Sequence, residues 1–573
     1  MVALVERTQT HLTLQTETIA PNTLAIRSQD WDRDRFDIEF ELQNGTTYNS
    51  FLIQSEKTAL VDTSHEKFRS LYLDLLSGVV DISTIDYLVV SHTEPDHSGL
   101  IKDILERAPQ ITVVGAKVAI QFLEDMVHRP FQRMLVKNGD RLDLGNGHEL
   151  EFVSAPNLHW PDTILTFDHK TQVLFTCDVF GLHYCDDHLY DDTLSLIEAD
   201  YKLYYDCLMG PNARSVLAAL KRMGDLPEVK TIATGHGPLL QYNIPELVGR
   251  YRTWSQEQAK AETTVAIFYA VDYGYSDALA HAIAQGIQKT GVAVELIDLK
   301  STDPQEVTEV VGLATGIVIG MPAQADAAVT SPILSTILAA VNAKQVVGLF
   351  ESGGGDDESV YPFRNKFQEI GVREAFAPIL IKETPYDTTY QLCDESGIDL
   401  GQWLTRDRTV KQMKALDNDL DKALGRISGG LYIITAQKGD VSSAMLASWV
   451  SQASAKPLGI SIAVAKDRAI ESLMRVGDRF VLNILEEGNY QPLMKHFLKR
   501  FPPGGDRFAG IKTYPAANGS PILADALAYL ECEVVSRMDC PDHWVVYSTV
   551  DIGRISKADG LTAVHHRKVG NHY

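Results

Sequence analysis

The sequence predicts a multidomain α/β protein, and three observations support this fold class. The chain has 573 residues, which corresponds to about four domains at roughly 150 residues each, with three or five acceptable. Apolar residues make up 45% and charged residues 22%, a composition typical of folded globular chains. The hydrophobic pattern also changes near residues 260 and 425, which indicates segments of different architecture.

The first segment, 1–260, is predicted to contain short strands with helices between them. β-Branched and apolar runs bounded by Gly, Asp or Asn predict the strands, and apolar residues at helical spacing predict the helices. The expected strands are Tyr48–Gln54, Thr58–Asp62, Tyr87–Ser91, Ile111–Val114, His148–Ser154 and Val173–Thr176, and the expected helices include Glu66–Leu76, Ala116–Met126 and Pro245–Ala259. We therefore expect mixed layers of sheet and helix.

The second segment, 261–405, alternates fully apolar strands with helices such as Ser276–Lys289. This pattern is typical of a doubly wound parallel sheet covered on both faces. The expected strands are Thr264–Tyr269, Ala293–Asp298, Gly316–Gly320 and Gln345–Phe350. A charged stretch, Thr405–Lys422, predicts a connecting helix, assigned as a linker over 406–424.

The third segment, 425–573, returns to strand patterns and predicts a small β-barrel. The expected strands are Leu431–Ala436, Leu458–Val464, Arg479–Leu485, Leu530–Arg537 and His543–Ile552. This segment contains 17 Lys and Arg against 14 Asp and Glu, whereas the whole chain has a net charge of −24. The asymmetry supports a separate C-terminal module.

Charge and composition exclude several classes of function. A chain with 52 basic and 76 acidic residues is a poor partner for nucleic acid or an anionic membrane. No apolar run approaches the roughly 20 residues of a membrane-spanning helix, and the N-terminus does not resemble a signal peptide. The six cysteines are scattered without a CxxC pair, which argues against a disulfide framework. We therefore expect a cytoplasmic protein.

The most informative motif is Val89–Gly99, where a strand leads into a loop. The loop carries four metal-capable side chains within six residues, namely His92, Glu94, Asp96 and His97. Ligands at the end of a strand stand on a rigid edge. Taken alone, the loop is also compatible with polar residues that cap the following helix.

Three later residues of the same chemical type also follow apolar strands. They are His159, Asp178 and His236, and each is expected to point from a sheet edge towards one place. His183 and Tyr184 come shortly after Asp178, and we expect them either beside this site or in a surface loop rich in His and Asp. The sequence therefore predicts one metal site built from seven residues.

The second segment carries loops suited to a phosphate and an aromatic cofactor. The loop between its first strand and first helix contains Tyr273, Gly274, Tyr275 and Ser276, and exposed amides at a helix N-terminus favour phosphate. Ser276 alone is equally compatible with a simple helix cap. Two further strand ends carry Met321, Pro322, Ala323 and Ser352, Gly353, Gly354, Gly355.

The first segment resembles the metallo-β-lactamase-like superfamily and, within it, the flavodiiron proteins. The lactamase-like pattern H-x-H-x-D-H has Glu94 in place of its second histidine here, and added carboxylate ligands suit iron. The resemblance implies an αββα domain that binds two irons. It assigns His92, Glu94 and His159 to one iron, Asp96, His97 and His236 to the other, and Asp178 to a bridge between them.

The other two segments also resemble flavin proteins. Segment 261–405 is similar to a flavodoxin-like FMN domain, with the isoalloxazine ring between the two later loops. Segment 425–573 is similar to the flavin reductases, a split β-barrel family that binds FMN or FAD, and Ser443, Ser448 and His543 match its flavin-facing positions. Pro541 replaces the glycine of the family's G-D-H element.

The order of the three segments resembles the flavodiiron proteins of oxygenic phototrophs. The resemblance implies an oxidoreductase that passes electrons from NADH or NADPH through flavin to iron and reduces dioxygen to water as a protective electron sink. Ferredoxin as donor, a homodimer or larger even oligomer, and a hetero-oligomer with a homologue are also compatible. The alternatives are nitric oxide reduction at the same site, a zinc hydrolase fused to flavin modules, and a regulatory protein with an idle metal site.

Overall fold

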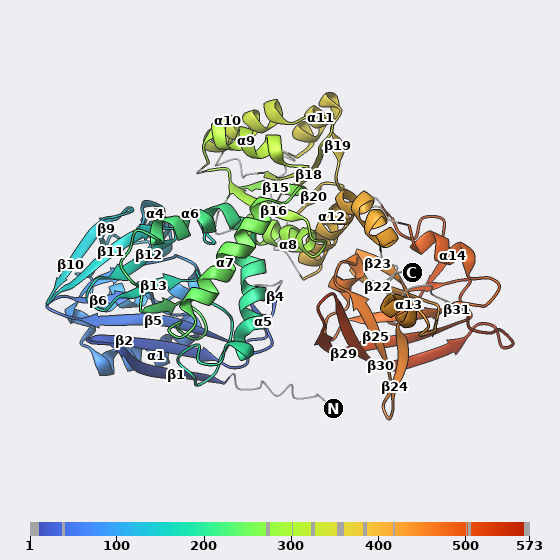
Figure 1. Ribbon diagram of the computed structural model, residues 1–573, viewed down its shortest axis with the longest axis horizontal. Helices are drawn as coiled ribbons and strands as arrows, with labels where there is room; N and C mark the ends of the chain where they lie inside the picture. Colours follow the sequence, from blue (N-terminus) through green and yellow to red (C-terminus); the bar gives the residue numbers. More distant parts are fainter. Residues whose placement is uncertain are drawn as a thin grey trace. The chain divides into compact units, whose positions relative to one another are not determined.

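The computed structural model describes residues 11–36, 40–270, 275–300, 302–321, 327–351, 360–381, 387–415, 419–439, 441–499, 501 and 506–565. The chain divides into two compact units, Met1–Ala261 and Glu262–Tyr573, which Figure 1 colours blue to green and green to red. In the described part of the chain, no helix is both long and apolar enough to cross a membrane.

The first unit contains two β-sheets that pack face to face. The seven-stranded sheet has the order β1-β2-β5-β6-β7-β8-β9 and the five-stranded sheet the order β10-β11-β12-β13-β14. The strands of the first sheet are β1 (Leu12–Ala20), β2 (Thr23–Asp30), β5 (Thr46–Gln54), β6 (Thr58–Val61), β7 (Ile85–Val89), β8 (Thr112–Gly115) and β9 (Gln132–Leu135). Those of the second are β10 (Arg141–Gly145), β11 (His148–Ser154), β12 (Ile164–Asp168), β13 (Val173–Cys177) and β14 (Thr231–Thr234).

Helices cover the outer face of each sheet. One outer core joins the first sheet to α1 (Arg69–Val79), α3 (Ile101–Arg107) and α4 (Lys117–Val127). The other joins the second sheet to α5 (Leu194–Tyr204), α6 (Ala213–Met223) and α7 (Ile244–Ala259). A third core fills the space between the sheets, and these layers confirm the predicted αββα fold.

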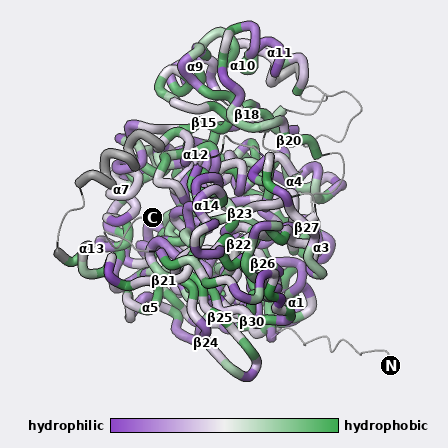
Figure 2. The backbone as a smooth tube through the Cα atoms, turned by 90° about the vertical axis from the view of Figure 1, so that its right-hand side faces the viewer, coloured by the Kyte–Doolittle hydropathy of each residue, from purple (hydrophilic) through white to green (hydrophobic). Residues whose placement is uncertain are grey.

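The second unit begins with a parallel sheet of order β16-β15-β17-β18-β19, with β20 also paired to β18. Its strands are β15 (Thr264–Tyr269), β16 (Ala293–Asp298), β17 (Gly316–Met321), β18 (Val346–Glu351), β19 (Arg373–Glu374) and β20 (Ile379–Leu380). Its helices are α8 (Ser276–Gln288), α9 (Pro304–Leu313), α10 (Ala327–Ala340) and α11 (Val360–Ile370). Purple and green alternate along α9 and α11 in Figure 2, as expected for helices with one buried face.

The connecting helix differs from the prediction. Instead of beginning at Thr405, α12 spans Asp387–Ala415, and a separate α13 spans Asp419–Leu424. The first half of α12 packs closely on α8, since a Cβ added at Gly286 would lie 2.1 Å from the Asp394 carbonyl oxygen. Acidic residues in this half are buried and paired with cations, so the segment lacks the apolar stripe from which a helix is predicted.

The C-terminal part of the second unit is an antiparallel sheet of order β23-β22-β26-β29-β30-β25-β24, in agreement with the predicted barrel module. Its strands are β22 (Tyr432–Lys438), β23 (Val441–Ala447), β24 (Val450–Ala455), β25 (Leu458–Ala465), β26 (Arg479–Ile484), β29 (Ala528–Asp539) and β30 (His543–Ile555). A short 3-10 helix, η6 (Ala469–Leu473), and α14 (Gln491–Phe497) pack beside it.

The hairpin of β1 and β2 is an element that the sequence did not predict. β2 contains the run Arg27, Ser28, Gln29 and Asp30, all of which are buried. A strand normally shows alternating apolar and polar residues or a continuous apolar run, and this polar run has neither pattern. The pairing of β2 between β1 and β5 depends on contacts that are distant in sequence.

Candidate metal centre

The loop after β7 and the short helix α2 (Pro95–Ser98) place the first four predicted ligands. His92 and His97 are fully buried, and Glu94 and Asp96 are 8% and 6% exposed. Pro95 occupies the first position of α2, where its missing N–H costs no helical hydrogen bond. The capping role considered for the loop's polar residues is not seen at α2, because its N-cap residue Glu94 makes no side-chain capping hydrogen bond and Asp96 lies inside the helix.

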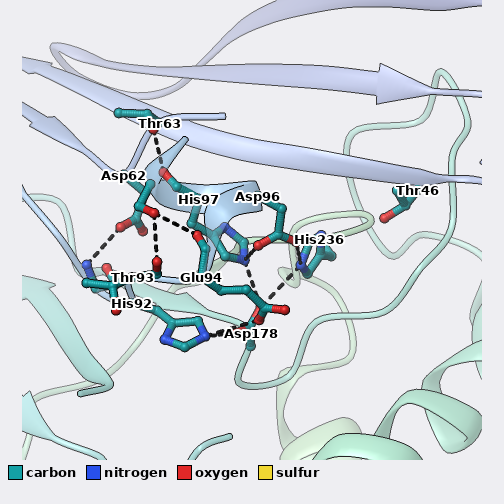
Figure 3. A network of polar contacts seen from close by, with 12 residues as sticks. Thr46, Asp62, Thr63, His92, Thr93, Glu94, Asp96, His97, Asp178 and His236 are labelled. Atoms are coloured by element: carbon teal, nitrogen blue, oxygen red, sulfur yellow. Dashed lines mark hydrogen bonds and ion pairs between the residues drawn. The ribbon is translucent and has the colours of Figure 1, made fainter. Parts of the chain in front are cut away.

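The other three predicted ligands come from loops that follow the second sheet's strands. His159 lies in the loop after β11, Asp178 directly follows β13, and His236 follows β14. All three are buried. The loop after β7 and these three loops meet at one edge of the sandwich, and Figure 3 shows side chains from both sheets converging there.

The seven side chains form two adjacent groups. Within each group, the potential ligand atoms lie within 4.8 Å of one another. The first group contains His92, Glu94, His159 and Asp178, and the second contains Asp96, His97 and His236. Asp178 is central, because its oxygens lie 3.5, 2.9, 3.8 and 3.2 Å from Nε2 of the four histidines in chain order. The structure thus brings together all seven residues that the sequence singled out.

Hydrogen bonds to the far sides of two rings determine which nitrogen faces the centre. Nδ1 of His236 lies 2.7 Å from the Thr47 carbonyl oxygen, which can only accept a hydrogen bond. Nδ1 of His92 lies 2.9 Å from Oδ1 of Asp162, whose pKa is lowered because the His92 contact outweighs the effect of burial. Both rings therefore carry a proton on Nδ1 and, when neutral, direct the Nε2 lone pair inward.

This arrangement is electrostatically incomplete without a cation. Nε2 of His236 lies 3.3 Å from Oδ2 of Asp96 and 3.2 Å from Oδ1 of Asp178. It lacks a partner with hydrogen-bond geometry, as do both carboxylate oxygens of Asp96 and Oδ2 of Asp178. Buried polar atoms are normally paired, so the donor set fits metal ions placed between these atoms.

The pKa values show the same demand for positive charge. Burial alone lowers the pKa of His236, but Asp178 and Asp96 outweigh it and raise the pKa to about 10. Burial is likewise outweighed at His159, where Glu94 raises the pKa to about 9. A bound proton takes the place of a cation at these rings when the site holds no metal.

Two supporting residues escaped the sequence reasoning. Asp162 accepts hydrogen bonds from His92 and from the backbone and hydroxyl of Thr93. The Tyr204 hydroxyl donates to Oδ1 of Asp178 at 3.1 Å. Asp162 lies three residues after His159, and that spacing was the one available signal, whereas Tyr204 belongs to a helix whose packing no local pattern reveals.

Only part of the predicted flavin-binding set in the second unit lies among the described residues. Tyr275 is exposed and precedes α8, Ser276 is the buried first residue of that helix, and Met321 is the buried end of β17. Because β15, β17 and β18 are parallel neighbours, the loops after them leave the same edge of the sheet. Outside the described residues are Tyr273, Gly274, Pro322, Ala323, Ser352, Gly353, Gly354 and Gly355.

The three residues singled out in the barrel module occupy different surroundings. Ser448 is buried directly after β23, beside Trp449, whose ring centroid lies 5.0 Å from that of His543. His543 begins β30, with its side chain 23% exposed. Ser443 is buried within β23 and contacts Glu395 of α12. Trp449 and His543 therefore lie side by side, while Ser443 faces the helix.

Comparison with known proteins covers nearly the whole chain. Residues 46–237 match the ODP family of beta lactamases, residues 267–397 match flavodoxin, and residues 424–571 match the flavin reductase-like domain. Diflavin flavoprotein A 1 from Synechocystis sp. is 68% identical over 565 residues, which is 99% of each chain. A Nostoc sp. relative from the same diflavin flavoprotein A series is 70% identical over 574 residues and 100% of both chains.

A solved structure shows the same relationship for the first two modules. The metal-soaked Flv1 flavodiiron core from Synechocystis sp. PCC6803 is 35% identical, with a TM-score of 0.66, and the match covers 69% of this chain and 99% of that one. With two relatives near 70% identity across the full length, the chain belongs to the three-domain flavodiiron proteins of the diflavin flavoprotein A family, which are oxidoreductases with FMN and a di-iron site.

Proposed function

We propose that this protein reduces dioxygen to water with electrons from NADH or NADPH. Flavin supplies the conversion of a two-electron hydride into single electrons, and a pair of irons supplies the site where a diatomic substrate is bound and reduced. The observation that carries the proposal is the convergence of seven His and carboxylate ligand atoms in two adjacent groups around Asp178.

The proposal assigns a role to each of the seven side chains. His92, Glu94 and His159 would hold one iron, and Asp96, His97 and His236 would hold the other. Asp178 would be shared between the two, a role that is supported by its approach to all four histidines. The mixture of three carboxylates and four imidazoles is harder than an all-histidine zinc cage and favours iron.

The surrounding residues orient these ligands and exclude bulk water. Asp162 and the Thr47 carbonyl keep the protons of His92 and His236 on Nδ1, so that Nε2 points inward. The Tyr204 hydroxyl holds one oxygen of Asp178. All seven ligands are buried. Burial strengthens each electrostatic interaction in the site, and it allows only small molecules to reach the ligands.

The proposal extends to the rest of the chain. We assign 1–260 to the metal domain, 261–405 to an FMN domain, 406–424 to a linker and 425–573 to a reductase that accepts hydride. The loop that ends at Ser276, the loop that begins at Met321 and the loop 352–355 would bind FMN, and Ser443, Ser448 and His543 would bind the reductase flavin. We also propose a homodimer or larger even oligomer, because a neighbouring subunit can bring its flavin to the metal site. Light scattering measures the mass of that assembly directly.

One experiment separates the alternatives. Metal analysis and an optical spectrum of the purified protein come first, and zinc in place of iron would support the hydrolase instead. The protein is then reduced anaerobically with NADH, NADPH or reduced ferredoxin and mixed rapidly with dioxygen or nitric oxide. We expect NAD(P)H to reduce the flavin and dioxygen to reoxidise it without release of peroxide. Reoxidation by nitric oxide alone would contradict the proposal.

A further inference from the structure

A small cavity lies beside the metal centre, on the side of α5. It has a volume of about 20 Å³ and is lined by Phe36, Leu42, His183, Asp200, Leu203, Tyr204, Cys207 and Leu208. This volume is sufficient for one water molecule. Most of the lining is apolar, so a water there depends on the few polar groups that face it.

Two of the polar lining groups also contact the metal ligands. Tyr204 donates from its hydroxyl to Oδ1 of Asp178 at 3.1 Å. The ring of His183 lies 4.7 Å from that of His236, centroid to centroid. Nδ1 of His183 bonds to the Thr46 hydroxyl at 2.8 Å, and its Nε2 is buried without a hydrogen-bond partner. The cavity therefore adjoins the inner face of the centre.

The third polar lining group, Asp200, is an acid that can exchange protons. Asp200 and Tyr204 stand one turn apart on α5 (Leu194–Tyr204), which places them on the same helix face. Asp200 is only partly buried, and its oxygen Oδ2 accepts a hydrogen bond from Asn44 at 3.1 Å. Burial raises the pKa of Asp200 to about 6, so this carboxyl is protonated in part of the molecules near neutral pH.

The reaction needs such a group because the centre is buried while the reaction consumes protons. Reduction of one dioxygen takes four electrons and four protons and yields two waters. Two molecules of NAD(P)H supply the four electrons and two of the protons, and two more protons come from solvent. The hydrides are accepted at flavin, so every proton used at the iron site has to cross the protein to reach it.

We propose that Asp200 takes up these protons from solvent and passes them through the cavity to the metal centre. A proton moves from the Asp200 carboxyl to a water in the cavity, and the water releases one of its own protons to the Tyr204 hydroxyl oxygen. Tyr204 in turn gives up the proton that it directs at Asp178, so each relay group ends in the protonation state in which it began. Solvent then reprotonates the carboxylate. The ionisable groups that face Asp200 are Tyr204 and Cys207 from its own helical stretch and His183 and Tyr184 from the loop after β13. This inference rests on the proposed function in that the centre must consume protons.

The test uses the full-length protein loaded with iron and flavin, in which Asp200→Asn removes the exchangeable proton and keeps the size. Loss of a proton relay typically costs about 10²–10⁴ in rate. We expect Asp200→Asn to slow dioxygen reduction by at least about tenfold, with a larger solvent deuterium isotope effect and normal iron content. Asp200→Glu, or a small weak acid added to Asp200→Asn, should restore part of the rate.

Asp206→Asn is the matched control. Asp206 lies six residues further along and is bound to Lys202 rather than lining the cavity, so its variant should keep the wild-type rate and isotope effect. Infrared difference spectra give a readout that does not depend on turnover. Subtraction of the Asp200→Asn spectrum from that of the wild type should leave a protonated carboxyl band that titrates near pH 6, and Asp206→Asn should retain this band. The buried Asp62, whose pKa burial also raises to about 6, is present in all three proteins and cancels in the difference.

Each other outcome overturns the inference. Asp200→Asn with the wild-type rate and isotope effect would show that protons take another route, and so would a difference spectrum that lacks the band. Loss of iron in Asp200→Asn would show that Asp200 is a structural residue. If the proposed function itself is wrong, the result looks different. The wild-type protein then does not reduce dioxygen, while the infrared difference band still identifies Asp200 as a protonated carboxyl.

Discussion

Each unit of the molecule buries a cluster of charged side chains, and the two clusters are satisfied in opposite ways. The metal centre in the first unit joins three carboxylates to four histidines. In the second unit, the ion network joins the flavodoxin-like and reductase-like parts. Its members are Lys289, Asp394, Glu395, Asp399, Glu471, Arg475, Arg507 and Arg537.

The ion network neutralises itself. Lys289 on the turn after α8 lies 2.8 Å from Asp394 of α12 and 2.7 Å from Glu471 of η6. Arg537 of β29 lies 2.5 Å from Glu471. Arg507 binds Glu395 and Asp399 of α12 at 2.9 and 2.7 Å. Four basic side chains thus face four acidic ones, so the partners of these charged groups come from the chain itself.

The metal centre has the opposite balance. The partners that the structure gives Asp96 and Asp178 are histidine rings and Tyr204, and three of the four oxygens of these two carboxylates lack a hydrogen-bond partner. The comparison teaches that burial of charge alone does not mark a ligand site. Buried carboxylates whose oxygens stay unpaired among histidine rings do mark one, because buried ions without full pairing are too costly to persist.

The largest expected effect is the loss of iron when the shared carboxylate is removed. Asp178→Ala takes away the group that approaches all four histidines, so we expect iron content to fall from about two per chain to well below one and dioxygen reduction to be abolished. Asp394→Ala, the matched change in the ion network, should keep its iron. Metal analysis after gel filtration measures both, and equal iron in the two variants would break the comparison.

The next effect is on stability, and it belongs to the ion network. Glu471→Ala leaves Lys289 and Arg537 buried without their shared partner, and such a loss costs about 3–5 kcal/mol. The free energy of unfolding of the second unit, followed by urea titration, should fall by that amount while iron content stays normal. A change below about 1 kcal/mol would show that the network behaves like exposed ion pairs.

A smaller effect is expected from the residue that orients His92. Asp162→Asn weakens the hold on the Nδ1 proton, and loss of such a supporting contact typically lowers metal affinity about 10–100-fold. Competition with a chelator measures the affinity. Asp168→Asn is a useful control. Asp168 binds the buried His148 at 2.8 Å within the five-stranded sheet, and this pair does not belong to any metal-ligand group in the described part of the chain.

The smallest effect is a dependence of stability on pH. Burial alone raises the pKa of Glu471, but Lys289 and Arg537 outweigh it and hold the pKa well below its ordinary value. A depressed pKa in the folded state contributes stability above the unfolded value of 4.5, and this stability is lost as pH falls below that value. Urea titrations at pH 6 and pH 3.5 should therefore show a steeper loss in the wild type than in Glu471→Gln. Parallel losses would assign the acid sensitivity to other groups.

Local patterns predicted most of the regular structure and the whole set of metal-type residues. β11, β15 and β16 have the predicted bounds, because apolar runs bounded by turn residues are visible within a few positions. The seven ligand-type residues were found because each follows an apolar strand. The bounds of α12 and the β1–β2 hairpin were missed, since their buried faces carry charged and polar residues that look exposed when only the sequence is considered.

The sequence by itself determined the element types, the order of three modules and the chemical identity of the candidate ligands, because these depend on short-range periodicity and residue type. Only the tertiary structure decided how closely Asp178 approaches all four histidines, that Asp162 and the Thr47 carbonyl orient two rings, and that Asp200 shares a cavity with Tyr204. It alone also paired Lys289 with Glu471, 182 residues apart. Hydrogen bonds and ion pairs act over about 3 Å, so their partners are set by how distant segments pack.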